Sequence, residues 1–270
     1  MKKIVLNLIL VLITTALIGC KSNKYETIKV VATQVPHEVI LIEAIPYLNE
    51  LGYDLEITVI SDYSLGNPAV SSGSADVNFF QHIPYFNEYN SRVKDSEKLV
   101  NVGNIHIEPI GLYGGSKNNI NDIKSGDKII ISDNISDYGR IVEFLKNIDL
   151  ITTIDNFNPT NVYASPEEAI LTKKVDFTFQ VIDAALLVKA RANKEGAFLF
   201  INGNYALEGG LGLDDVLVLE PTINNPYVNI IACLNGHEND PKIKALVEVL
   251  TSKVIQDFIK EKYDGSVIPA

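Results

Sequence analysis

The sequence predicts an α/β protein of two lobes with a cleft between them. From residue 28 onward, short apolar strands alternate with amphipathic helices, the pattern of a parallel sheet with helical crossovers. The alternation starts afresh near residue 128, which indicates a second sheet. The last strand and two helices form no sheet of their own, so we expect them to return to the first lobe. The chain would then cross between the lobes near residues 106–112 and 222–230.

This pattern predicts lobe 1 from residues 28–108 and 226–270, and lobe 2 from residues 109–225. The chain has 270 residues, of which 46% are hydrophobic, enough for two lobes with separate cores. A net charge of −11 argues against nucleic acid as a partner. An anionic ligand stays open, because one well-placed arginine can bind a carboxylate.

Residues 1–19 have the features of a signal peptide. Lys2 and Lys3 precede an apolar run at 4–18, which is too short to span a bilayer comfortably. The run ends in L-I-G-C (17–20), which resembles the bacterial lipobox, a signal cut before a cysteine that is then lipidated. We therefore expect a lipid on Cys20, a polar tether at 20–27 and attachment to the cell membrane, outside the cytoplasm. The alternative is a cleaved secretory peptide with a chance cysteine.

In lobe 1, Gly52 ends the first helix, Pro46 predicts a kink in it and residues 62–68 have a loop composition. The predicted strands are 28–32, 55–60, 77–80 and 99–105, and the predicted helices are 36–51, 69–72 and one that begins at Pro84. In the C-terminal piece we expect a strand at 227–234 and helices at 241–250 and 253–263.

Lobe 2 follows the same alternation. The sequence S-P-E-E (165–168) has the form of a capping box that opens a short helix. The predicted strands are 109–113, 128–132, 176–180, 197–201 and 216–219, and the predicted helices are 139–150, 183–191 and 205–209.

The stretch D-V-N-F-F-Q-H-I-P-Y (76–85) is the first candidate binding element. It passes from an apolar strand into a helix, and such joints lie at the carboxyl end of a sheet, where ligands bind. Phe80 and Tyr85 beside His82 indicate a small ligand with an apolar part. The alternative is a core strand followed by a polar helix start.

Residues 133–140 form a second candidate, because they join a strand to a helix N-terminus that favours an anion. Arg140 in the first turn suits a carboxylate. Alternatively, Arg140 pairs on the surface with Asp133 or Asp137. Asn202 and Asn229 stand in apolar strands, so each needs a partner from the backbone or from a ligand.

Enzyme chemistry has little support. We find no nucleophile elbow, zincin or P-loop pattern, and the histidines at 37, 82, 106 and 237 have no metal-ligand spacing. We therefore expect neither a metal nor a cofactor, and no catalysis. Cys233 lies in an apolar run and is expected to be a buried, inert thiol.

Several collinear motifs resemble the NlpA/MetQ family of methionine-binding lipoproteins. They are D-Y (62–63), N-F-F-Q-H-I-P-Y (78–85), V-G-N-I-H-I-E-P-I-G-L-Y (102–113), G-R (139–140), I-N-G-N-Y-A-L-E (201–208), N-P-Y-V-N (225–229) and K-E-K-Y-D-G-S-V-I-P (260–269). The resemblance implies a type II periplasmic-binding-protein fold that delivers methionine to an ABC permease and its ATPase.

The resemblance also implies roles for individual residues. Arg140 would take the α-carboxylate, while Asn202 and Asn229 would contact the amino-acid backbone groups. The side-chain pocket would be lined by Tyr63, Phe80, His82 and Tyr85.

Two positions depart from the family, which usually has asparagine at Asp137 and proline at Gly66. Asp137 would either pair with an α-ammonium group or compete with a carboxylate for Arg140. The ligand therefore stays open among L-methionine, D-methionine and a methionine-containing dipeptide. Alternatives are another amino acid or organic anion, or a surface adhesin or sensor without transport.

Overall fold

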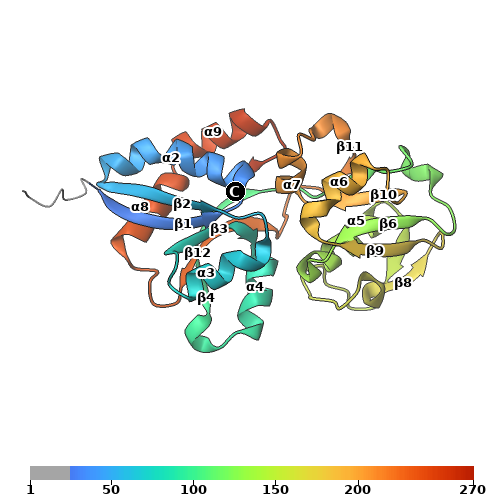
Figure 1. Cartoon of the computed structure of the whole chain (residues 1–270). Coiled ribbons are helices and arrows are strands. Elements are labelled where there is room, and N and C mark those ends of the chain that lie inside the picture. The colour runs from blue at the N-terminus through green and yellow to red at the C-terminus, as the bar shows by residue number, and fades with distance from the viewer. Residues whose placement is uncertain (1–24) are drawn as a thin grey trace, which may run out of the picture.

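The computed structural model describes residues 25–270 as two lobes that lie side by side (Figure 1). Within these residues, no helix is long and apolar enough to cross a membrane. The signal peptide and the lipidated Cys20 expected from the sequence lie outside the described residues.

Lobe 1 is built on a six-stranded mixed sheet with the order β13-β4-β12-β3-β1-β2. β1 pairs in parallel with β2 and β3, whereas β12 runs antiparallel to β3 and β4. The strands are β1 (Glu26–Ala32), β2 (Tyr53–Val59), β3 (Val77–His82), β4 (Leu99–Ile107), β12 (Val228–Leu234) and β13 (Ile268–Pro269).

Helices cover both faces of this sheet, because successive strand residues alternate between two cores. Val30 packs in a cluster with helices α2, α8 and α9, and Val31 packs in another with α3 and α4. The helices are α2 (Val39–Glu50), α3 (Gly66–Ser71), α4 (Ile83–Arg92), α8 (Pro241–Leu250) and α9 (Lys253–Tyr263), with a π-helical turn at Gln34–Glu38.

Lobe 2 has a five-stranded sheet with the order β11-β5-β10-β6-β9 and a separate ribbon of β7 and β8. Ile129 and Ile131 of β6 pack against α5, and Ile130 packs on the opposite face against α6. The strands are β5 (Gly111–Gly114), β6 (Lys128–Ser132), β7 (Ile151–Thr153), β8 (Ile170–Lys173), β9 (Thr178–Ile182), β10 (Phe198–Ile201) and β11 (Val216–Leu219), and the helices are α5 (Tyr138–Asn147), α6 (Leu187–Ala192) and α7 (Gly203–Glu208).

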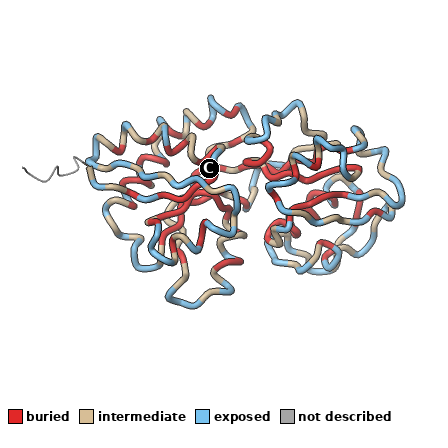
Figure 2. Tube along the Cα trace, viewed as in Figure 1, coloured by how far each residue is buried: buried red, intermediate tan, exposed pale blue. Residues whose placement is uncertain are grey.

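Two segments join the lobes. The chain leaves the first sheet after β4 and enters the second at β5, and it returns between β11 and β12. Each lobe has its own buried interior, as Figure 2 shows by the buried residues along the strands. A two-lobed protein with two such connections can open and close by bending at the connections.

Two sequence expectations about local structure were wrong. The expected loop at 62–68 contains a 3-10 turn at Tyr63–Leu65, since the Asp62 carboxylate accepts a bond from the Ser64 N–H, and α3 starts directly after it. The capping box at Ser165 is not formed, because Glu168 accepts a hydrogen bond from the Ala164 N–H instead.

Candidate ligand site between the lobes

The joint between β3 and α4 lies at the cleft, as the sequence predicted. All six residues of β3 are buried, so the strand is part of the core up to its last residue, His82. His82 is the N-cap of α4, and its Nδ1 accepts a hydrogen bond of 3.1 Å from the Tyr85 N–H. Because Nδ1 accepts this bond, the ring donates through Nε2, which points across the cleft into lobe 2.

An inner pocket lies at this joint. It is small, about 30 Å³, which is room for roughly two water molecules. A methionine can therefore enter only if the lobes or the lining side chains move apart. The lining residues come from both lobes and are Tyr63, Phe80, Gln81, His82, Tyr85, Asn134, Asn202, Asn204 and Asn229.

Six of these residues are among those expected from the sequence: Tyr63, Phe80, His82, Tyr85, Asn202 and Asn229. The structure brings them together around one space, although they lie in widely separated parts of the chain. Arg140 and Asp137, also expected at the site, do not line the inner pocket. Asp137 contacts three of the lining residues, His82, Asn134 and Asn202, and Arg140 lies on the other side of Asp137.

Three aromatic rings form the wall on the side of lobe 1. The Phe80 ring centroid is 6.0 Å from that of Tyr63 and 5.7 Å from that of Tyr85, and the two tyrosines are 6.1 Å apart. Burial raises the pKa of both tyrosine hydroxyls, so they stay neutral. This wall suits an apolar, polarisable group.

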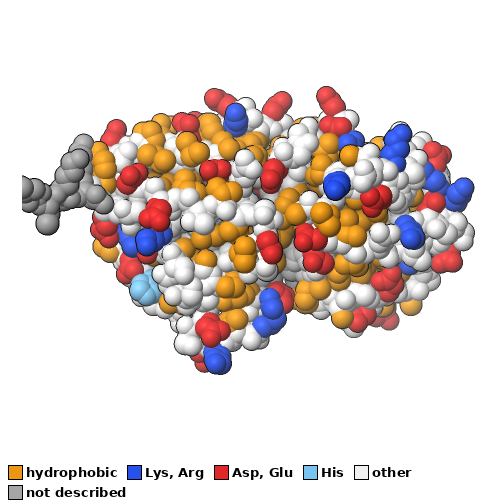
Figure 3. Space-filling view, viewed as in Figure 1, with side chains coloured by type: hydrophobic (Ala, Val, Ile, Leu, Met, Phe, Trp, Pro, Cys, Tyr) orange, Lys and Arg blue, Asp and Glu red, His pale blue; other side chains and the backbone are white. Residues whose placement is uncertain are grey.

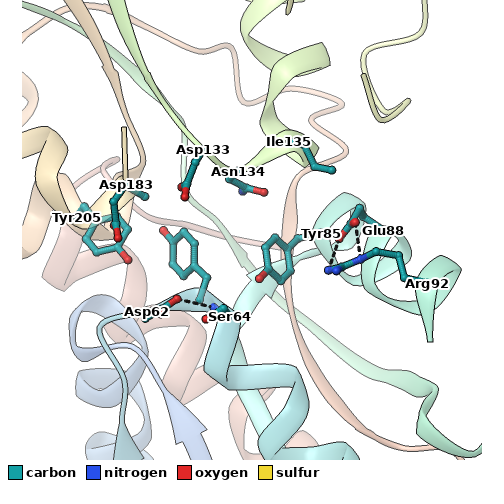
Figure 4. Close-up of a pocket in the computed structure, with 12 residues that line it drawn as sticks. Asp62, Ser64, Tyr85, Glu88, Arg92, Asp133, Asn134, Ile135, Asp183 and Tyr205 are labelled. Atoms are coloured by element: carbon teal, nitrogen blue, oxygen red, sulfur yellow. Dashed lines mark hydrogen bonds and ion pairs between the residues drawn. The ribbon is translucent and has the colours of Figure 1, made fainter. Parts of the chain in front are cut away.

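An outer cavity of about 250 Å³ extends from the aromatic wall toward solvent (Figure 4). Figure 4 shows Tyr85 near its centre and Tyr205 at one side, while Asp62 of lobe 1 faces Asp133 and Asp183 of lobe 2. Acidic side chains lie near the boundary between the lobes on the face seen in Figure 3. The mouth of the cleft is therefore acidic, which favours a ligand that carries a positive charge.

Asp137 bridges the two lobes from behind the pocket. It is fully buried; its Oδ1 accepts a hydrogen bond of 3.0 Å from His82 Nε2, and its Oδ2 accepts bonds of 2.8 Å from Asn134 and Asn202. Burial alone would raise the pKa of Asp137, but the contacts with His82, Arg140 and Asn202 hold it at about 2. Asp137 is therefore an ionised acceptor at neutral pH.

Arg140 is not a surface residue. Its side chain is 3% exposed and forms a two-pronged ion pair with Glu220, in which Nε lies 2.7 Å from Oε1. Its Nη2 also donates to the backbone oxygen of Glu108, and its guanidinium lies over the ring of Tyr227. Glu220 outweighs the effect of burial and raises the arginine pKa. Only Nη1, 3.6 Å from Asp137 Oδ1, has no close partner among the described residues.

The pair of Arg140 with Asp137 that the sequence left open is present, but it is buried and long, at 3.6 Å. The main partner of Arg140 is Glu220, which lies 80 residues away.

Each of three amides at the pocket uses one end of its side chain to bond a neighbour. Asn202 donates through Nδ2 to Asp137, whereas Asn229 accepts at Oδ1 from His37 Nε2 at 3.2 Å. Asn204 accepts at Oδ1 from the Tyr63 hydroxyl. Within the described part of the chain, Asn202 Oδ1 and Asn204 Nδ2 are buried without a hydrogen-bond partner. Buried polar atoms of this kind are expected to bond a ligand.

A buried cluster of His37, His106 and Glu108 lies beneath Asn229, at the start of the first connection. Its potential ligand atoms lie within 4.8 Å of one another, a grouping that the spacing of the histidines did not predict. Glu108 Oε1 is 2.7 Å from His106 Nε2 and 3.2 Å from His37 Nε2, which are distances of hydrogen bonds. We therefore describe the cluster as a hydrogen-bonded support of the hinge.

The comparisons with known proteins agree with this architecture. Residues 28–270 match the family model described as NlpA lipoprotein. The chain belongs to the NlpA lipoprotein family.

The methionine-binding lipoprotein MetQ of Bacillus subtilis (strain 168) is 42% identical over 275 residues, which cover 100% of this chain and 99% of that protein. The D-methionine-binding lipoprotein MetQ of Yersinia pestis is 28% identical and covers 80% of this chain and 78% of its own length. Among solved structures, a nutrient-binding protein from Burkholderia cenocepacia bound to methionine superimposes with a TM-score of 0.80. It is 26% identical and covers 90% of this chain and 99% of its own. The NlpA chain described here therefore has the two-lobed fold of ABC substrate-binding proteins.

The sequence-based site lacks four residues. Gln81, Asn134 and Asn204 line the inner pocket, and Glu220 holds Arg140. Asn204 lay within the motif at 201–208, two residues after Asn202, and its place at a helix start was a usable signal. For Glu220 the local sequence offers no signal, because the contact depends on how the second connection packs.

Proposed function

We propose that this chain is a lipid-anchored solute-binding protein that captures methionine between its lobes and delivers it to an ABC permease and its ATPase. The observation that carries this proposal is the inner pocket, where an aromatic wall from lobe 1 faces amide groups from lobe 2 and from β12. The family and the names of the relatives support methionine as the ligand.

The aromatic wall suits the thioether of methionine. A sulfur atom near an aromatic ring contributes roughly 0.3–1.5 kcal/mol, in addition to the burial of the side chain. In this proposal Tyr63, Phe80 and Tyr85 surround the methylthioethyl group, and His82 closes the end near Asp137. The neutral hydroxyls of the two tyrosines add no charge to this part of the pocket.

The polar end of the ligand would lie toward lobe 2 and β12. Asn229 Nδ2 and Asn204 Nδ2 are donors that suit a carboxylate. Arg140, which does not line the inner pocket as it stands, would reach the carboxylate through Nη1 once the lining side chains have moved to admit the ligand. Glu220 keeps the guanidinium in one orientation, so Arg140 is held ready for the carboxylate at no further entropic cost.

Observations outside the pocket support the membrane anchor and the transport partner. The L-I-G-C sequence at 17–20 and the family name both favour a lipid on Cys20, which would hold the receptor at the outer side of the cell membrane. A receptor in this position would present its closed form to a permease.

Calorimetry and thermal unfolding with L-methionine, D-methionine, glycyl-methionine and the other common amino acids test the ligand. We expect a methionine compound to raise the melting temperature, since a ligand that binds only the folded state stabilises it. A response to a different amino acid alone would establish another solute. No response to any compound would overturn the proposed function.

The role of Arg140 needs a comparison of two ligands, because its removal also leaves Glu220 buried without a partner. Wild type is expected to bind methionine at least tenfold more tightly than methioninol, which lacks the carboxylate. Arg140→Ala is expected to lose most of this preference. If the preference survives the substitution, Arg140 does not bind the carboxylate.

A further inference from the structure

The orientation of the Asn202 amide is fixed by Asp137. Because a buried, ionised carboxylate can only accept hydrogen bonds, the group of Asn202 that faces it must be the NH₂. The oxygen of Asn202 is therefore turned away from Asp137. It has no hydrogen-bond partner among the residues that the structure describes, and Asn202 lines the inner pocket.

Of the four other amides that line the pocket, Gln81 and Asn134 have both ends of the side chain bonded to neighbouring residues, whereas Asn204 and Asn229 behave in the opposite way to Asn202. Asn229 uses its oxygen to accept from His37, and Asn204 uses its oxygen to accept from Tyr63. Each of these amides therefore has its NH₂ group left for a ligand. The pocket has two amide donors and, at Asn202, one amide acceptor, and this matches the carboxylate and the ammonium group of a free amino acid.

We propose that Asp137 is a positioning residue that turns the carbonyl of Asn202 toward the ligand and so makes the site select for a free amino group. The inference rests on the proposed function and deepens it. Asn202 contacts the ligand, and Asp137 acts through Asn202.

A direct contact between Asp137 and the ligand fits the structure less well. Asp137 does not line the inner pocket, and it is fully buried. His82 and Arg140 lie at its Oδ1, and Asn134 and Asn202 occupy its Oδ2. Both oxygens of this carboxylate are thus engaged by groups of the protein.

Asparagine at position 137 would release the constraint. An amide has one acceptor atom, so its NH₂ must face either Asn202 or the pair of His82 and Arg140. Facing His82 places the NH₂ against another N–H, because Nδ1 of that ring is occupied by the Tyr85 N–H. We therefore expect the NH₂ to face Asn134 and Asn202. Asn134 loses its bond to residue 137, because its oxygen is held by Ser136. The amide of Asn202, whose oxygen has no partner among the described residues, turns over to accept from the new NH₂ and presents its own NH₂ to the ligand.

The experiment compares L-methionine with 4-(methylthio)butanoic acid, which is methionine without its amino group. Calorimetry on the folded protein gives the ratio of the two dissociation constants. In wild type we expect the desamino compound to bind at least tenfold more weakly, as for the loss of a charged hydrogen bond. Asp137→Asn is expected to reduce this ratio several-fold, chiefly by weakening methionine.

A double-mutant cycle separates positioning from direct contact. In Asn202→Ala the ratio is expected to be small, and adding Asp137→Asn should change it no further. If Asp137→Asn still lowers the ratio in the Asn202→Ala background, Asp137 contacts the ligand itself and the inference is wrong. An unchanged ratio in Asp137→Asn alone also overturns it.

Asp176→Asn is the matched control. It removes the same charge from an exposed position just before β9, at the end of the strand away from the cleft, and should leave the ratio unchanged. If Asp137→Asn does not fold, Asn202→Ala alone tests the inference. A ratio of the two dissociation constants that stays at the wild-type value in Asn202→Ala would exclude Asn202 as the acceptor for the amino group. If wild type binds no methionine compound, the proposed function fails, and the inference with it.

Discussion

At the scale of single residues, burial sets the charge of the histidines behind the hinge. Burial lowers the pKa of His106 to about 3, and it lowers that of His37 to about 4 against the opposing effect of Glu108. Both rings are therefore neutral in the folded protein at neutral pH. Unfolding returns each ring to water, where its pKa is about 6.5.

The pH dependence of stability follows from this difference. Below about pH 6.5 the unfolded chain binds a proton at His106 that the folded protein does not bind, so acid favours unfolding until the pH approaches 3. Each pH unit in this window costs about 1.4 kcal/mol, or about 2 kcal/mol between pH 7 and pH 5. His106→Gln keeps a donor for Glu108 and removes the titrating ring.

We therefore expect wild type to lose about 2 kcal/mol more of its free energy of unfolding than His106→Gln between pH 7 and pH 5. Urea unfolding at the two pH values measures both losses. Equal losses in the two proteins would mean that His106 is protonated in the folded state or that it does not become solvated on unfolding.

Individual site residues were predictable where one motif carried the information. Phe80, His82 and Tyr85 lie within six positions at a strand-to-helix joint, and this joint is a place where α/β sheets bind ligands. The partners of the site residues were not predictable. His37 and Asn229 are 192 positions apart, and only the order of strands in the sheet brings β12 close to His37.

At the scale of elements, α3 and β3 shape the apolar wall together. Gly66, the first residue of α3, lies so close to Phe80 that a methyl group on it would be 2.2 Å from Phe80 Cε1. The absence of a side chain at Gly66 thus permits the present position of the Phe80 ring. The Phe80 ring in turn forms the part of the aromatic wall between Tyr63 and Tyr85.

Gly66→Ala is expected to move the Phe80 ring and to weaken methionine binding about tenfold, with a loss of stability of about 1–3 kcal/mol from the added bulk. Calorimetry and urea unfolding give the two values. Gly212→Ala is the control, since no atom lies within 4 Å of the added methyl position. Wild-type affinity in Gly66→Ala would show that the Phe80 ring can shift without affecting the ligand.

The succession of elements was largely predictable, whereas short elements were not. β6, β11 and α9 begin and end where the sequence patterns placed them. The ribbon of β7 and β8 and the strand β13 have two to four residues each, too few for a period of two to be visible. β13 forms because the chain end lies against the edge of β4, which is a tertiary effect.

At the scale of the whole molecule, the lobes are held together by direct contacts as well as by the two connections. The Tyr205 hydroxyl donates a hydrogen bond of 2.8 Å to the backbone oxygen of Ser61, and the Tyr63 hydroxyl donates to Asn204. α7, which starts after Asn202, also packs against the π-helical turn of lobe 1. These contacts favour the closed arrangement before any ligand contributes.

Removing the hydrogen bond between Tyr205 and Ser61 tests how much closure of the lobes contributes to methionine affinity. This bond joins the lobes at the outer cavity, and Tyr205 does not line the inner pocket. If methionine binds the closed form, the observed dissociation constant rises in proportion as the closed form becomes less populated. A hydrogen bond contributes roughly 0.5–1.5 kcal/mol, so Tyr205→Phe is expected to weaken methionine binding about two- to tenfold.

Small-angle scattering of the free protein should show a larger radius of gyration for Tyr205→Phe, and both proteins should become equally compact at saturating methionine. Tyr89→Phe provides the control, because its hydroxyl donates to Ser71 within lobe 1 and its loss leaves the lobe contacts intact. A Tyr205→Phe protein with wild-type affinity and dimensions would show that closure is governed by the connections and the ligand.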